Sequence, residues 1–209
     1  MRVLVTGGGC EEPIDGVRFL ANFSSGKTAS FLADHFAACG HEVTALMAHR
    51  AERPSGAVRV LGFRSFGDLS DTLQSLLGRE DFDLVIHAAA VSDFTPESIL
   101  VGGVSTPAGP AGKIESGRGN GATITLRENP KLIDSLKAWS RNDRCVIVGF
   151  KLTAGAGERD REEAARALLV RSGADLVVSN DRSEISVDGH PFACYALSRD
   201  GSLALARRG

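Results

Sequence analysis

The sequence predicts an α/β protein: a Rossmann-like parallel sheet with helices on both faces, in a single domain with a flap. Two observations predict this class. Apolar runs of strand length alternate with amphipathic stretches along the chain, and a run of glycines follows the first apolar stretch. Alternation of this kind favours parallel strands joined by helical crossovers. We expect one domain over residues 1–209, because nothing resembling a linker divides the chain.

The first half of the chain supplies most of this alternation. Residues 1–6 form a short apolar run that ends at glycines, which is typical of a buried strand. Residues 27–39 carry apolar side chains at helical spacing, and Gly40 stops the run. By the same criteria we expect strands at 42–47, 58–61 and 83–90 and a leucine-faced helix at 66–77.

The second half begins with a segment of different composition. Residues 92–120 are dominated by Gly, Pro and Ser, so we expect a long loop or flap rather than core. The pattern then predicts strands at 122–126, 145–150 and 175–179, and helices at 130–139 and 159–173. Residues 192–197 are expected to add one more strand or a hairpin.

Composition excludes several classes of protein. Lys and Arg total 24 against 26 Asp and Glu, so the chain lacks the basic excess of a nucleic-acid binder. No apolar run reaches the ~18 residues of a transmembrane helix, and the first residues do not form a signal peptide. The four cysteines are too widely spaced for a zinc site or a disulfide framework. We therefore expect a cytoplasmic protein that binds neither membrane nor nucleic acid.

The loop after the first strand carries the first candidate site. Gly7 opens the sequence GGGCEEP, which departs from the G-x-G-x-x-G dinucleotide pattern. A second turn, Ser24-Ser25-Gly26, precedes the first helix. Hydroxyls and free N–H groups at a helix N-terminus bind anions, so a phosphate site at residues 24–27 is indicated. The alternative is that Ser24 or Ser25 serves only as a helix N-cap.

The sequence DLVIHAAAVSDF is the second candidate, because three alanines at a strand end let a ligand lie against the backbone. Similar strings occur in extended short-chain dehydrogenases and sugar epimerases, which need a Tyr-x-x-x-Lys pair. Here the one tyrosine is Tyr195 and position 199 is Arg199, which argues against an NADP-dependent oxidoreductase. We interpret His87 as a hydrogen-bonded strand residue rather than a catalytic base.

Two lysines complete the candidates. Lys113 lies in the flap and can swing over a phosphate or a developing negative charge, or it is an ordinary surface lysine. Phe150 and Lys151 follow a strand that ends at Gly149. There an aromatic ring can flank a nucleobase and a lysine can contact phosphate, with core packing as the alternative for Phe150.

Taken together, these motifs resemble those of a known family, the phosphopantothenoylcysteine synthetases. The matching strings, in the family's order, are GG-x-E-x-ID at 8–15, VRFLANFSSG at 17–26, AAAVSDF at 88–94, KI at 113–114, ENPKLI at 128–133, VGFKL at 148–152 and GADLVVSND at 173–181. NFSSG and GFKL look more like the standalone synthetases than half of a bifunctional protein.

The resemblance implies a fold and an activity. Members activate 4'-phosphopantothenate with a nucleoside triphosphate, CTP or ATP, accompanied by Mg²⁺. The resulting acyl-nucleotide then reacts with cysteine to form an amide in coenzyme A biosynthesis. The family has a Rossmann-like domain that forms a homodimer, with a flap that reaches the active site.

The resemblance also implies site residues. Asn22, Arg18 and Lys113 match the family's catalytic positions. The nucleotide-binding positions are matched by Gly8, Gly9, Ser24, Ser25, Gly26, Ala90, Asp93, Asn129, Pro130, Phe150 and Arg171. No residue is assigned as a metal ligand.

Three residues depart from the family pattern. Cys10 replaces a frequent threonine, Glu115 replaces a second basic residue after KI, and Ala167 replaces a phosphate-binding lysine that Arg166 can compensate. These departures keep open a weakened relative that binds nucleotide or an acyl-phosphate without turnover. A nicotinamide-dependent oxidoreductase is the third alternative, and it rests on VTGGG and HAAAV alone.

Overall fold

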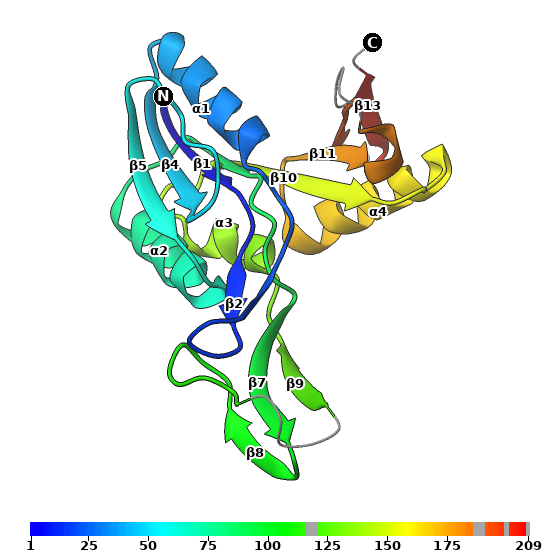
Figure 1. Cartoon of the computed structure of the whole chain (residues 1–209). Coiled ribbons are helices and arrows are strands. Elements are labelled where there is room, and N and C mark those ends of the chain that lie inside the picture. Colours follow the sequence, from blue (N-terminus) through cyan, green and yellow to red (C-terminus); the bar gives the residue numbers. More distant parts are fainter. Residues whose placement is uncertain (116–120, 186–190, 199–200, 208–209) are drawn as a thin grey trace.

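The computed structural model describes residues 1–115, 121–185, 191–198 and 201–207. Its main sheet, as described, runs in the order β13-β12-β11-β10-β6-β1-β4-β5 (Figure 1). The six strands from β11 to β5 are parallel, and β12 and β13 are antiparallel additions at one edge. Their bounds are β1 Arg2–Gly7, β4 Glu42–Ala48, β5 Val58–Phe63, β6 Leu84–His87, β10 Val146–Thr153, β11 Leu176–Asp181, β12 Ala193–Leu197 and β13 Leu203–Arg207. The expected Rossmann-like α/β class is confirmed.

Helices flank this sheet. The helix α1 (Lys27–Ala38) packs on β1 and β4, while α4 (Glu158–Ser172) packs on β10, β11 and β12. The helix α2 (Phe66–Arg79) contacts the short α3 (Leu136–Trp139), and its leucines at 69, 73, 76 and 77 are buried, as the sequence pattern predicts. Because strands proceed from β1 toward β5 in one direction and from β6 toward β11 in the other, right-handed crossovers put α1 and α4 on opposite faces.

A second, three-stranded sheet corrects the expectation of a long loop. Within residues 92–120, β7 (Phe94–Val101) and β8 (Val104–Pro107) form a hairpin, and β9 (Ala122–Glu128) pairs with β7. This flap sheet projects from the main body (Figure 1). The strand expected at 122–126 therefore lies outside the main sheet. Cross-strand backbone pairing overrides the local Gly- and Pro-rich composition, and Ile99 supplies a buried contact.

A small hairpin, β2 (Glu11–Pro13) with β3 (Phe19–Ala21), interrupts the connection from β1 to α1. Its Glu12 is buried and joins three parts of the molecule. One carboxylate oxygen accepts from the Phe66 N–H at the start of α2 at 2.6 Å, and the other accepts from the Thr95 hydroxyl in β7 at 3.2 Å. The Thr95 hydroxyl oxygen also accepts from the Asn129 amide at 2.9 Å. The base of the flap is thus tied to the main domain.

The remaining differences from the sequence prediction are local. The segment predicted as one helix at 130–139 begins as a 3-10 turn, η1 (Leu132–Ser135), and continues as α3. The strand β6 ends at His87, and Ala90 pairs instead with Gly9 as an isolated bridge. The chain end forms the hairpin β12–β13, and another 3-10 turn, η2 (Arg182–Glu184), follows β11.

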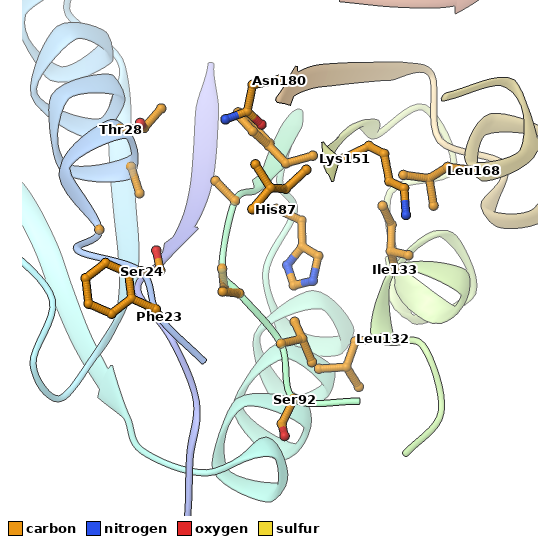
Figure 2. Close-up of a pocket in the computed structure, with 18 of the residues that line it drawn as sticks. Phe23, Ser24, Thr28, His87, Ser92, Leu132, Ile133, Lys151, Leu168 and Asn180 are labelled. Carbon is orange, nitrogen blue, oxygen red and sulfur yellow. The ribbon is translucent and has the colours of Figure 1, made fainter. Parts of the chain in front are cut away.

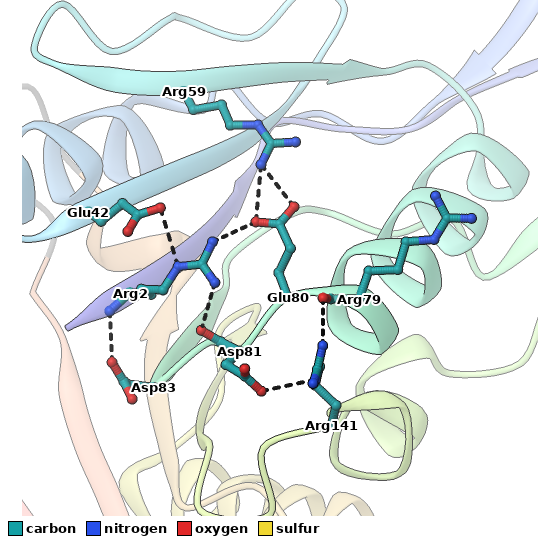
Figure 3. A network of polar contacts seen from close by, with 8 residues as sticks. All are labelled: Arg2, Glu42, Arg59, Arg79, Glu80, Asp81, Asp83 and Arg141. Carbon is teal, nitrogen blue, oxygen red and sulfur yellow. Dashed lines mark hydrogen bonds and ion pairs between the residues drawn. The ribbon is translucent and has the colours of Figure 1, made fainter.

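The amino ends of the central strands carry a polar network (Figure 3). Arg2 in β1 bonds Glu80 after α2 at 2.8 Å, and Glu80 also pairs with Arg59 of β5 at 2.8 Å. The Arg2 backbone N–H donates to Asp83, just before β6, at 2.8 Å. Partly exposed pairs of this kind stabilise weakly one at a time. Their arrangement joins the amino ends of three parallel strands, at the edge opposite the candidate site.

Candidate active site

A cavity of about 570 Å³ opens at the carboxyl ends of the parallel strands. It lies where the strand order reverses between β1 and β6, which is the place where open α/β sheets bind ligands. Figure 2 shows residues from the loop before α1, from β6 and from β10 around it. Among the sequence candidates, it is lined by Ser24, Ser25, Gly26, Ala90, Asp93, Pro130, Phe150 and Arg171.

One wall of the cavity is the N-terminus of α1. Gly26 is the N-cap residue, and no side chain caps the helix. The Ser25 hydroxyl makes only a long contact of 3.4 Å with the Lys27 N–H. The alternative in which either serine acts as a conventional N-cap is therefore not observed. An uncapped N-terminus with two adjacent hydroxyls suits an anionic group.

The opposite wall is built by β10, β11 and α4. Phe150 is half-buried and meets Phe192 edge-on, with ring centroids 6.3 Å apart. Lys151 and Asn180 come from the ends of the two neighbouring strands, and Leu168 comes from α4. The wall thus offers an aromatic face beside polar groups at the strand ends.

The cations around the cavity divide into two kinds. Lys131 pairs with Asp93 at 2.5 Å, and Arg171 pairs with Asp134 at 3.0 Å. Lys27 and Lys151 also line the cavity, and neither ammonium group has an acceptor among the residues that the structure describes. Asp93 is the one carboxylate in the described lining. The described lining therefore carries more positive than negative charge, and the ammonium groups of Lys27 and Lys151 can bind an anion.

The glycine loop after β1 holds Asn22 beside this cavity. Gly8 adopts φ +88°, and a side chain on Gly9 would meet the Asn22 carbonyl oxygen at 1.9 Å. The close approach requires glycine at position 9. The Asn22 side-chain amide then donates to the Val91 carbonyl at 3.3 Å, in the loop that follows β6. Gly8, Gly9 and Asn22 therefore shape the back of the site without forming its described lining.

Arg18 and Lys113 lie together in a different place. Arg18 pairs with Asp15 at 2.6 Å, and Asp15 also accepts from the Ile114 N–H of the flap at 3.0 Å. This bond, with those from the Val17 and Arg18 N–H groups and the Arg18 charge, lowers the pKa of Asp15 to about 2. Lys113 is exposed and lines a second cavity of about 410 Å³ beside this junction. Neither Arg18 nor Lys113 lines the main cavity as described.

Sequence comparison identifies the family. The family model for the DNA/pantothenate metabolism flavoprotein C-terminal domain matches residues 1–205. The chain belongs to this family. It is 33% identical to the coenzyme A biosynthesis bifunctional protein CoaBC of Thermococcus kodakarensis, over 99% of this chain and 49% of that protein. CoaBC of Mycobacterium tuberculosis is 32% identical over 100% and 48%. The chain thus spans about half the length of the curated relatives it matches.

Solved structures agree with the fold. The DNA/pantothenate metabolism flavoprotein from Streptococcus pneumoniae superposes with a TM-score of 0.86 at 28% identity, over 99% of this chain and 92% of that one. A Cab2 H337A variant in complex with phosphopantothenate-cysteine superposes with a TM-score of 0.76 at 22% identity, over 100% and 80%. The resemblance to this family that the sequence motifs suggest is confirmed.

Within this flavoprotein C-terminal domain, Asn129 occupies a structural position. It is buried, and its amide donates to the Ser92 carbonyl at 3.1 Å and to the Thr95 hydroxyl oxygen at 2.9 Å. It therefore supports the neighbouring Pro130, which does line the cavity. Tyr195, the residue on which a dehydrogenase pair would depend, is buried in β12 and is absent from the described lining.

The departures from the family pattern also have defined positions. Cys10 is fully buried, and burial raises the pKa of its thiol to about 11, so it is not a reactive thiolate. Glu115 lies beside Lys113 at the second cavity. Arg166 donates to the Gly201 carbonyl at 2.9 Å and does not line the main cavity as described. Arg171 is therefore the α4 cation placed at the site.

Sequence reasoning missed Asp15, Lys131 and the partnership of Thr6 with His87. Asp15 and Lys131 lie inside matched strings, ID and ENPKLI, which was the available signal. The described residues contain no group of three His, Cys, Asp or Glu side chains that could hold a metal ion. None of the helices in the described ranges is long and apolar enough to cross a membrane.

Proposed function

We propose that this chain is a phosphopantothenate–cysteine ligase of coenzyme A biosynthesis. It would join 4'-phosphopantothenate and cysteine through an acyl-nucleotide, using CTP or ATP. The observation that carries the proposal is the switch-point cavity, which is lined by the uncapped N-terminus of α1, with Lys27 as its first residue, and by Lys151 of β10. Neither lysine has an acceptor among the described residues. The names of the CoaBC relatives and the phosphopantothenate-cysteine bound to Cab2 support this choice of substrates.

The lining of the cavity supports one position for the triphosphate and another for the base. The triphosphate would lie at Ser24, Ser25 and Gly26, where helix N–H groups and hydroxyls are available. Lys27, Lys151 and Arg171 would offset its charge. The ring of Phe150 would flank the base. A charge of this size needs several cations, which agrees with a cavity where Lys27 and Lys151 have no acceptor among the described residues.

The reaction then has two displacements. A carboxylate oxygen of phosphopantothenate attacks the α-phosphorus, and pyrophosphate leaves. The cysteine amine next attacks the acyl carbon, the nucleoside monophosphate leaves, and the nitrogen loses its proton. Asn22, held by Val91 behind the cavity, would donate to an oxygen that carries charge in these steps. Lys113 would act from the flap, and Arg18, which contacts Asp15 and the Ile114 carbonyl near Lys113, would bind a carboxylate or phosphate.

Magnesium fits this site as an ion carried by the triphosphate. Mg²⁺ binds through one or two carboxylates together with substrate phosphates. Asp93 is the one carboxylate in the described lining, so Asp93 would hold the ion, and phosphate oxygens would provide the other ligands. Bound there, Mg²⁺ would offset the charge of the phosphates. Lys131, which pairs with Asp93, would then be released toward the nucleotide.

A homodimer is part of the proposal. The flap sheet exposes apolar side chains at Leu100, Val104 and Leu126, and Phe23 at the rim of the main cavity is 97% exposed. Apolar surface of this kind suits a contact with a second copy, and two-fold contacts are the commonest arrangement. Lys113 would then come within reach of substrate in one or the other protomer. Sedimentation of a monomer at micromolar concentration would contradict the dimer.

Turnover with each of the four nucleoside triphosphates tests the proposal. We expect pyrophosphate release that requires 4'-phosphopantothenate, and amide formation that also requires cysteine. Nucleotide binding without pyrophosphate release would instead favour the weakened relative. An NADPH titration without binding would exclude the oxidoreductase. The standalone form stays a prediction, since the matched relatives are about twice as long.

A further inference from the structure

His87 is a buried side chain with one nitrogen bonded inside the protein and one toward the cavity. It is the last residue of β6, is 5% exposed, and lies opposite Thr6 in the pairing of β1 with β6. Its Nδ1 lies 2.9 Å from the Thr6 hydroxyl oxygen. The same hydroxyl oxygen accepts a hydrogen bond from the Ala89 N–H at 3.2 Å.

The position of the imidazole proton is assigned from these hydrogen-bond partners. The Thr6 hydroxyl has one proton to donate, and His87 Nδ1 is its one acceptor among the described residues. Nδ1 is then the unprotonated nitrogen, and the proton lies on Nε2. Burial lowers the pKa of His87 to about 4, so the ring is neutral at pH 7. His87 therefore carries one N–H, and that N–H is not used by Thr6.

The free N–H faces the apolar part of the cavity. In Figure 2 the ring points toward the side of the cavity that holds Leu132 and Ile133, and no described residue accepts a hydrogen bond from Nε2. Ile133 also packs against Gly149, opposite His87 on β10: a Cβ at position 149 would lie 2.4 Å from the Ile133 Cδ1 atom. The charged groups of the lining are Lys27, Asp93, Lys131, Lys151 and Arg171, from the elements around it.

We propose that His87 is a specificity-determining residue that donates its Nε2–H to a ring nitrogen or carbonyl oxygen of the nucleobase. The inference rests on the proposed nucleotide site. A neutral donor in apolar surroundings suits an uncharged acceptor, whereas the lysines and Arg171 suit phosphates. Leu132, Ile133 and Phe150 provide the flat apolar contacts that a base requires. Thr6 acts as a positioning residue through its bond to Nδ1.

Calorimetry with three probes tests the direct contact: CTP, ATP and inorganic tripolyphosphate. We expect His87→Met, which removes the N–H at similar volume, to weaken the preferred nucleotide by roughly 3- to 12-fold. Tripolyphosphate should bind His87→Met as it binds the wild type. His87→Gln keeps an N–H donor and should recover part of the loss. Equal weakening of tripolyphosphate, or unchanged nucleotide binding by His87→Met, would overturn the proposal.

Imidazole ¹⁵N spectra test the tautomer independently of any activity. We expect a protonated Nε2 and a bare Nδ1 in the wild type and in Thr6→Ser, and a mixture in Thr6→Val, which lacks the hydroxyl. A protonated Nδ1 in the wild type would contradict the assignment. Normal ligase turnover with an unchanged nucleotide KM in His87→Met would defeat the inference alone. Absence of turnover in a wild type that still shows the three-probe pattern would defeat the proposed function alone.

Discussion

The main cavity differs from the flap junction, where Asp15 and Arg18 meet Ile114 of the flap, in how many of its polar groups have hydrogen-bond partners. In the cavity, Lys27 and Lys151 have no acceptor among the described residues, and α1 begins without a side-chain cap. At the junction, Asp15 is almost fully buried and accepts from Arg18 and from the backbone N–H groups of Val17, Arg18 and Ile114.

The difference separates groups that can bind a ligand from groups that fix the conformation of the flap. Groups without partners are available to a ligand, whereas groups that satisfy one another fix a conformation. The cavity is therefore built to receive charge. The junction holds the flap loop against residues 14–18, and it places Lys113 on a structured base. Substitutions of the groups without partners, Lys113 included, should accordingly change activity, whereas substitutions within the hydrogen-bonded junction should change stability.

The largest effect is expected from Asn22→Asp. The added charge lies beside the proposed triphosphate, and a carboxylate cannot donate to the Val91 carbonyl. We expect amide formation to fall by at least about 100-fold while the melting temperature changes little. The matched control is Asn142→Asp, because Asn142 also donates from its amide to a backbone carbonyl, that of Phe82, away from the cavity. Near-normal turnover by folded Asn22→Asp would remove Asn22 from the mechanism.

Lys113→Gln should lower the rate and leave stability intact. The side chain is exposed, with no acceptor among the described residues, so its removal costs no packing. Loss of one preorganised donor corresponds to about 2 to 4 kcal/mol in the transition state. Single-turnover kinetics with the acyl-nucleotide quantified measure the loss, and a thermal melt checks the fold. A much lower melting temperature would show that Lys113 belongs to the junction rather than to the reaction.

Gly16→Ala should do the reverse and act on the junction. A side chain at position 16 would meet the Gly112 carbonyl oxygen at 2.5 Å, where the Gly16 N–H donates to that oxygen at 2.7 Å. We expect a loss of about 1–3 kcal/mol in stability and a smaller loss of activity. Gly78→Ala in α2 is the control, because nothing lies within 4 Å of the added carbon. An unchanged melting temperature of Gly16→Ala would mean that the flap loop can shift away from position 16 without loss of stability.

The smallest expected effect is a difference in pH dependence. The folded-state pKa of His87 is about 4 and its ordinary value is 6.5, so its contribution to stability is complete above pH 6.5. That contribution is lost as pH falls from 6.5 toward 4, by at most roughly 2 kcal/mol between pH 6.5 and 5. Asp15, with its pKa lowered from 3.8 to about 2, loses its contribution only below pH 4. Thermal melts as a function of pH should show no His87-dependent loss of stability between pH 6.5 and 4 in His87→Gln, and no Asp15-dependent loss below pH 4 in Asp15→Asn.

The main sheet was predictable because its central strands are local runs of apolar residues. Apolar runs such as 1–6 and 42–47 become buried once the neighbouring helices pack on them. The local sequence shows both the apolar runs and the helical periodicity of those neighbours. The flap sheet was not predictable in this way. Pro96, Gly102 and Gly103 in and beside β7 read as turn residues, and pairing with β9 across more than twenty residues decides the structure.

The site divides along the same line. Ser24, Ser25 and Gly26 directly precede α1, and Phe150 lies toward the carboxyl end of β10, so position in the sequence indicates the cavity. The bond between Asp15 and Ile114 joins residues 99 positions apart, and no local pattern contains it. His87 was rightly interpreted as a bonded strand residue, but the direction of its second nitrogen depends on Thr6, which belongs to another strand.

The buried carboxylate of Glu12 has a consequence for cooperativity. Burial raises its pKa, and its two oxygens reach the first N–H of α2 and the hydroxyl of Thr95 in the flap sheet. When β7 separates from the main domain, Glu12 loses the Thr95 bond and water enters beside Phe66. The protection of the Phe66 amide against hydrogen exchange, although it belongs to a helix outside the cavity, should therefore depend on the free energy of flap opening.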